Sequence, residues 1–153
     1  MQYVYWLMAF AVGMGSAVQA AINARLAHGL GNQTLSAAFV SFLIGTLCLA
    51  AVMLYQNNFG GLLDNLATQP WWRWLGGIIG AGFVFSMAML APKIGLVNMV
   101  FLVILGQLVA GMAIDLFGLI QMPVRPLSWY KYLGMAVMLV GLLVFMFGDR
   151  IKA

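Results

Sequence analysis

The sequence predicts an all-α integral membrane protein with five transmembrane helices per chain, and three observations lead to this prediction. Of the 153 residues, 65% are hydrophobic and 7% are charged, which leaves too little polar surface for a soluble domain. The charged residues divide the chain into long uncharged runs. None of these runs alternates polar and apolar residues, as the strands of a membrane β-barrel would. Because lipid offers the backbone no hydrogen-bonding partner, helices are expected.

The lengths of the apolar runs set the expected spans. A spanning helix needs about 20 mainly apolar residues, and five runs meet or approach that length. They form a single transmembrane domain over residues 1–153, and the helices are expected at Tyr5–Ile22, Leu35–Tyr55, Trp74–Leu90, Val97–Phe117 and Tyr130–Gly148. In the connections we expect Thr34 and Ser128 to cap the helices that follow them, and His28 to lie in the first loop.

The basic residues are shared almost evenly between the two ends of these spans. Lys/Arg bias in short loops normally fixes the orientation of a membrane protein. Here the two faces receive three and four: Arg73, Arg125 and Lys131 against Arg25, Lys93, Arg150 and Lys152. With an odd number of spans, the two orientations are inverses of each other. We therefore predict a chain that inserts both ways and pairs as an antiparallel homodimer of ten helices.

Aromatic and small residues indicate how the helices are anchored and packed. Trp and Tyr favour the membrane interface, and five gather at helix starts on one side: Trp71, Trp72, Trp74, Trp129 and Tyr130. Small residues let membrane helices approach closely, and Gly134, Gly141 and Gly148 recur every seven residues along the last helix. This glycine face either packs within the chain or forms a dimer seam.

Polar side chains inside two spans are the candidate substrate-binding residues. Ser16, Gln19 and Asn23 follow at spacings of three and four, so they share one face of the first helix. They either line a substrate cavity or hydrogen-bond to neighbouring helices. In the fourth helix Gln107 and Asp115 lie within about 80° of each other. Asp115 either pairs with Arg125, Lys131 or a partner subunit, or responds to protons or cations at a cavity mouth.

The residues that are missing argue against other functions. The sequence contains no glutamate, and the only histidine and cysteine are His28 and Cys48. No cluster of metal-ligand types occurs, and Ser16 has no neighbouring base. We expect no enzymatic activity, no metal, no cofactor and no nucleic-acid partner. Cys48 is expected to be a buried structural thiol.

Several motifs resemble a half-size bacterial branch of the drug/metabolite transporter superfamily, long known only as a five-helix domain of unknown function. They are GSAVQAAINARL at 15–26, SFLIGT at 41–46, WRWLGG at 72–77, PKIG at 92–95, GQL at 106–108 and IDLFG at 114–118. The resemblance implies that the chain corresponds to one half of the larger ten-helix relatives, whose two halves have inverted topology. It also implies a place in the bacterial inner membrane and a role in moving small molecules.

These observations predict a small-molecule transporter, either exporter or importer, that works by alternating access at the interface of an antiparallel homodimer. Its partners would be a small-molecule solute, membrane lipid and a second copy of the chain. Two alternatives stay open. The chain could be a non-transporting scaffold or regulatory subunit of another membrane protein, or one member of a transporter whose two related chains have fixed, opposite orientations.

Overall fold

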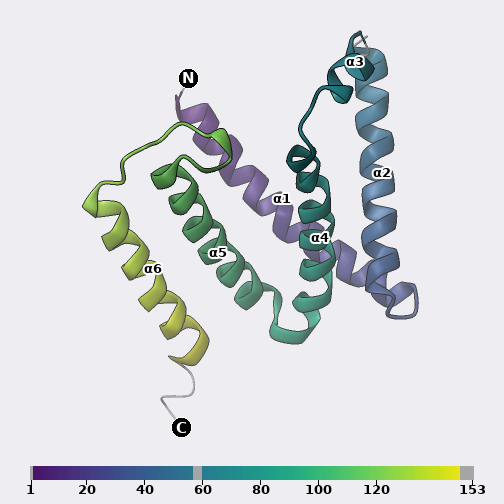
Figure 1. Cartoon of the computed structure of the whole chain (residues 1–153). Coiled ribbons are helices and arrows are strands. Elements are labelled where there is room, and N and C mark those ends of the chain that lie inside the picture. The colour runs from purple at the N-terminus through teal and green to yellow at the C-terminus, as the bar shows by residue number, and fades with distance from the viewer. Residues whose placement is uncertain (1, 57–59, 149–153) are drawn as a thin grey trace. The chain divides into compact units, whose positions relative to one another are not determined.

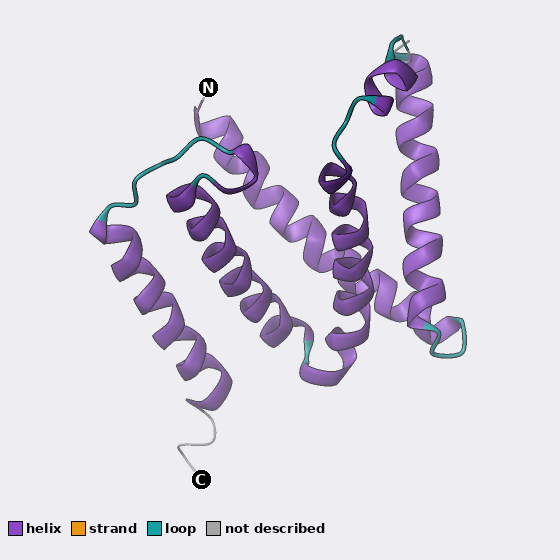
Figure 2. Ribbon diagram, viewed as in Figure 1, coloured by secondary structure: helices purple, strands orange, loops and turns teal. Residues whose placement is uncertain are grey.

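The computed structural model describes residues 2–56 and 60–148 and contains helices but no strands in these ranges (Figure 2). The long helices are α1 (Gln2–Gly29), α2 (Thr34–Tyr55), α4 (Leu75–Ile94), α5 (Leu96–Phe117) and α6 (Trp129–Phe147). With the 3-10 turn η1 (Trp71–Trp74) leading into α4, all five are long and apolar enough to cross a membrane. The prediction of an all-α protein with five transmembrane helices is confirmed.

The first two connections differ from the prediction. Helix α1 continues through Gly29, so His28 lies in its last turn and not in a loop. The run from Ala24 to Ala27 consists of good helix formers, and Arg25 is exposed, where its long side chain can reach the membrane surface. The second connection contains the short helix α3 (Leu62–Ala67), which was not expected.

The predicted helix caps are only partly correct. Thr34 is the first residue of α2 and not its cap, because Gln33 occupies the N-cap position. Gln33 makes no side-chain capping bond; its Oε1 instead accepts a hydrogen bond from Ser36 Oγ at 2.9 Å. Ser128 does occupy the N-cap position of α6, but without a side-chain hydrogen bond. The start of α2 therefore lacks the side-chain acceptor that such a position usually has.

The chain forms two compact units, Met1–Leu96 and Val97–Ala153. In the first unit α1, α2 and α4 pack against one another, with α1 crossing the other two near the α1–α2 turn (Figure 1). The buried apolar side chains lie at that end and are mostly small: Ala20, Ala27, Ala37, Ala38, Val84, Met87, Ala88 and Ala91. Small side chains let these helices approach closely where the hydrophobic effect contributes little.

Away from this packed end, the helices of the first unit present apolar side chains outward. The first half of α1, residues 2–15, is exposed throughout. Cys48, in the second half of α2, is also exposed, so the expectation of a buried structural thiol is wrong. The reason is that α2 packs through its first turns, where Ala37 and Ala38 lie.

The second unit consists of α5, α6 and the connection between them. Phe101 of α5 and Phe145 of α6 bring their ring centroids to 4.9 Å. The connection begins at Gly118, which has φ +61, and a Cβ there would lie 2.7 Å from Val124 Cγ2. The backbone N–H of Arg125 donates to the Asp115 carbonyl at 2.8 Å. The chain thus folds back over the end of α5 before α6 begins.

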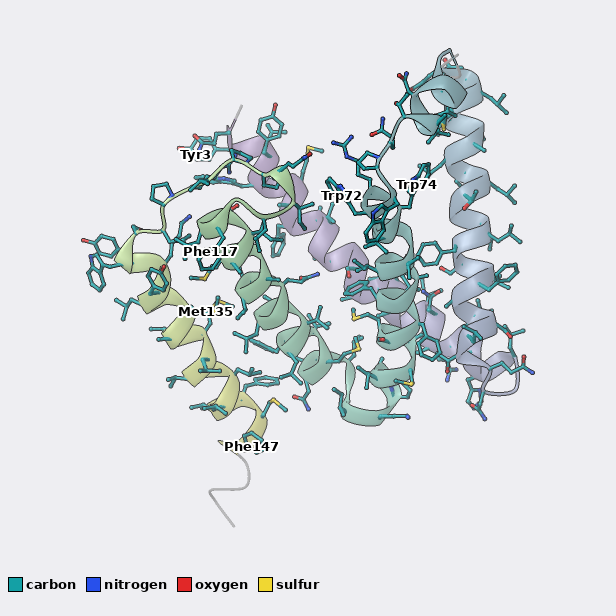
Figure 3. All side chains as sticks on the ribbon, in the orientation of Figure 1. Tyr3, Trp72, Trp74, Phe117, Met135 and Phe147 are labelled. Atoms are coloured by element: carbon teal, nitrogen blue, oxygen red, sulfur yellow. The ribbon has the colours of Figure 1, made fainter. Side chains whose placement is uncertain are left out.

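Aromatic residues occupy the starts of the helices, as the sequence suggested. Trp72 and Trp74, labelled in Figure 3, belong to η1, and the Arg73 guanidinium lies 5.2 Å from the centroid of the Trp72 ring. The rings of Trp129 and Tyr130 at the start of α6 are 4.3 Å apart. A further pair, Tyr3 and Trp6 at the start of α1, stacks edge-to-face at 5.5 Å and was not identified from the sequence.

The glycine face of α6 makes no close contact within the described chain. A Cβ added at Gly134 or Gly141 would meet no atom within 4 Å, and one at Gly148 would meet only Val144 of the same helix. Glycine in a helix interior costs stability relative to alanine. Close packing within the second unit therefore does not account for Gly141, while Gly134 borders the space between α5 and α6.

We predict that enlarging a small residue at the packed end of the first unit destabilises the protein. Ala37 has an exposed fraction of 0%, so Ala37→Leu should lower the free energy of unfolding by about 1–3 kcal/mol through overpacking. The measurement is unfolding of the purified protein in mixed micelles with a denaturing detergent. Ala110→Leu makes the same change at an exposed position of α5 and should have little effect. Equal losses in both variants would contradict the packing described above.

Candidate functional site

The polar residues of α1 lie together on the side of the helix that faces α4. Ser16, Gln19 and Asn23 border one narrow space with Phe83, Val84 and Met87, so the prediction that they share a face is confirmed. Ser16 is half-buried, Gln19 is exposed and Asn23 is buried. The space between them has no volume in which a water molecule would fit. In this unit the three side chains border a closed seam.

Asn23 stands out within this seam because of its amide. The side chain is 3% exposed, and its Nδ2 has no hydrogen-bond partner in the part of the chain that the structure describes. A buried donor without a partner costs about 1–3 kcal/mol. The interhelical hydrogen bond that the sequence offered as an alternative role is therefore not made by Nδ2.

The second set of polar residues lines an open groove between α5 and α6. Gln107 and Asp115 both line this groove, as expected for two residues on one face of α5. The volume of the groove is about 580 Å³. Gln107 is exposed and Asp115 is half-buried. Met135, labelled in Figure 3, lies on the wall that α6 contributes. Because thioether side chains adapt their shape to what they contact, this wall suits an apolar or amphipathic ligand.

The charged groups at one end of the groove are not paired with each other. Asp115 and Lys131 both line it, yet the described residues form no ion pair between the Asp115 carboxylate and Lys131 or Arg125. Arg125 approaches Asp115 through its backbone N–H. The predicted ion pair of Asp115 with Arg125 or Lys131 is therefore not formed among the described residues. One carboxylate and one ammonium are thus left free to contact a ligand.

Lys131 was not among the site residues expected from the sequence. Its position at the start of a helix is a feature that could have pointed to it. It lies in the first turn of α6, where the positive end of the helix dipole disfavours a cation. The structure shows that Lys131 lines the groove together with Asp115 and Gln107.

The described residues contain no group of three or more His, Cys, Asp or Glu side chains placed to hold a metal ion. The two polar sets belong to different units. The first is a closed seam with one unsatisfied donor, and the second is an open groove with an amide, an acid and a base. The groove can bind a solute through hydrogen bonds and charge.

Comparison with known proteins identifies the family. The model of the family described as "Putative inner membrane exporter, YdcZ" matches residues 4–144, a range that reaches from α1 into α6. Inner membrane protein YdcZ of Escherichia coli (strain K12) is 23% identical over 117 residues, which cover 76% of this chain and 78% of that protein. No solved structure matches the chain. The chain therefore belongs to the YdcZ family, a drug/metabolite transporter-like family of inner membrane proteins, and is itself a multi-pass protein of the inner membrane.

Proposed function

We propose that the chain exports a small amphipathic solute by alternating access, as an antiparallel homodimer. Gln107, Asp115 and Lys131 bind the solute in the α5–α6 groove. Ser16, Gln19 and Asn23 complete its path at the interface between the two copies. The observation that carries this proposal is the groove of about 580 Å³, which sets an amide, a carboxylate and an ammonium among apolar side chains of two membrane-spanning helices.

The lining of the groove supports an amphipathic solute. Membrane helices rarely keep polar groups within a span unless those groups face a cavity or a partner. The walls contain Leu108, Met112 and Met138, and the polar groups lie among them. A solute with an apolar body and a hydrogen-bonding or zwitterionic head matches both parts. This proposal agrees with the export role named for the family.

Two features support pairing of two copies in opposite orientations. The nearly even division of Lys and Arg between the two ends gives little preference for one orientation, although two of these residues, Arg150 and Lys152, lie outside the described ones. In addition, a Cβ added at Gly141 of α6 would meet no atom within 4 Å in the second unit. A second copy would cover this part of α6, and a two-fold axis in the membrane plane would supply each polar group twice.

The first prediction concerns topology. A C-terminal fluorescent reporter that is active only in the cytoplasm and a phosphatase reporter that is active only in the periplasm should both give signal. Adding a lysine to one end should then shift the ratio of the two signals, because loop cations set orientation. His28→Lys and Met122→Lys lie at opposite ends of the spans and should shift it in opposite directions.

A single active reporter would contradict dual insertion. In that case the chain would be one member of a heterodimeric transporter with fixed orientations, or a subunit of another membrane protein. These two are separated by whether the protein purifies with a related half-size chain or with an unrelated protein.

The second prediction concerns transport. Liposomes that contain the purified protein and are loaded with a small-metabolite extract should lose specific solutes faster than protein-free liposomes, as measured by mass spectrometry. Gln107→Ala removes a groove amide and should slow that loss about fivefold to tenfold, as expected for about 1–1.5 kcal/mol of lost hydrogen bonding. Gln2→Ala, at the exposed start of α1, is the matched control. Unchanged efflux from the Gln107→Ala liposomes would remove Gln107 from the site.

The third prediction separates folding from function at Asn23. Replacing the unsatisfied amide by an apolar side chain of similar size removes the cost of a buried donor. Asn23→Leu should therefore raise the free energy of unfolding by about 1 kcal/mol while it reduces solute efflux. Unfolding in mixed micelles and efflux from liposomes are measured on the same preparation. A marked loss of stability would show that Asn23 has a structural partner and would argue against a role in the solute path.

A further inference from the structure

A second pocket lies at the packed end of the first unit and is independent of the α5–α6 groove. Its volume is about 420 Å³. It forms where α1 ends, α2 begins and α4 ends, all on the same side of this unit (Figure 1). We call it the end pocket and define it by its polar lining residues, His28, Asn32, Thr34 and Lys93. Because these are the ends of spanning helices, the end pocket lies at the depth of the lipid headgroups.

The end pocket carries positive charge without a counter-charge. Lys93 lines it, and none of its lining residues is an acid. Neither Lys93 nor the nearby Arg25 forms an ion pair in the described part of the chain. Lys93, in the last turn of α4, does complement the negative end of that helix dipole. The helix dipole therefore accounts for the positive charge, but it does not account for the pocket beside that charge.

Hydrogen-bond donors surround the same space. The Thr34 hydroxyl and the Asn32 amide line it together with the His28 ring. The N-cap of α2 provides no side-chain acceptor, and the backbone N–H groups of Leu35 and Ser36 make no hydrogen bond within the described residues. A helix start with free N–H groups favours an anion. Charge and hydrogen bonding thus select the same kind of ligand.

A separate apolar groove lies nearer the middle of the span, on the same face of α4 as the end pocket. This second space, of about 340 Å³, lies between α2 and α4 and is lined by Leu35, Phe39, Phe42, Ala81, Gly82 and Phe85. On α4 the residues Ala81, Phe85, Ala88 and Pro92 follow at spacings of four, three and four. They therefore share one face of the helix. The first two line the groove and the last two line the end pocket.

We infer that the end pocket binds the phosphate group of an anionic membrane phospholipid, with one acyl chain along the α2–α4 groove. Lys93 supplies the charge, while Thr34, Asn32 and His28 donate hydrogen bonds to the phosphate oxygens. Soluble phosphate would satisfy the same polar groups, but it would leave the aligned apolar groove unused. The site rests on the first unit alone, so it does not depend on the proposed transport function.

The test is binding of lipid to the full-length protein in detergent, followed by native mass spectrometry and by the melting temperature. Phosphatidylglycerol should bind and raise the melting temperature, and added salt should weaken it. Phosphatidylcholine with the same chains should bind less, because its ammonium group offsets the phosphate charge. Inorganic phosphate should give little stabilisation at equal concentration.

The variants separate the pocket from general surface charge. Lys93→Gln should lower the affinity for phosphatidylglycerol about fivefold, the effect of one cation near an anionic lipid surface. Lys93→Arg should retain binding, which also shows that the site tolerates substitution without unfolding. Arg25→Gln also removes one positive charge at this membrane surface, but Arg25 does not line the end pocket. This variant should therefore change the affinity for phosphatidylglycerol little.

Three results would overturn the inference. Equal losses for Arg25→Gln and Lys93→Gln would mean diffuse attraction without a defined site. Binding of inorganic phosphate as strong as that of phosphatidylglycerol, with the same dependence on Lys93, would assign the pocket to a soluble anion. Equal binding of the two lipids that is insensitive to Lys93→Gln would mean general lipid coating of the helices.

Discussion

Within the hydrocarbon of a bilayer every backbone N–H and C=O must find its partner inside the protein, and the rest of this structure depends on that constraint. It confines the described residues to five long spanning helices and moves turns, unpaired helix ends and most charges to the two membrane surfaces. Interaction sites can then arise in two ways. Polar side chains can project from the helices into a groove, or the free ends of several helices can meet at one surface. The α5–α6 groove is of the first kind and the end pocket is of the second.

The spans could be predicted from the sequence because the lengths of the apolar runs are set by membrane thickness. The exact ends of the helices could not be predicted in this way. They lie at the membrane surface, where water can satisfy the backbone and both helix and loop are tolerated. The extension of α1 through Arg25 and His28 is one example, since an exposed arginine at a helix end reaches the surface at little cost. The exposure of Cys48 is another. Whether Cys48 is buried depends on which part of α2 packs against α1 and α4. A uniformly apolar sequence does not show which part that is.

For the candidate site, helix geometry predicts which side chains share a face. In each of the two expected sets the residues do border one common space. What each face contacts was set by other helices. Ser16, Gln19 and Asn23 adjoin Phe83, Val84 and Met87 of α4 without free space, whereas Gln107 and Asp115 adjoin a groove. Two details arise only from this tertiary arrangement: the unsatisfied Asn23 Nδ2 and the place of Lys131 beside Asp115.

The position of Asp115 also bears on how the proposed pair would work. Asp115 is the only acid in a described spanning helix, and it lies near the end of α5, so a single copy has no carboxylate at mid-depth to carry a proton across. In an antiparallel pair, one Asp115 would lie near each membrane surface. In each copy Asp115 and Lys131 would contact the solute near one surface, while Gln107, near the middle of α5, would hydrogen-bond it deeper in the span. Such an arrangement would give the solute a charged contact near each membrane surface and neutral contacts between them. The proposed symmetric pair would have such a charged contact near both surfaces, whereas the described helices of one chain have it only near the end of α5.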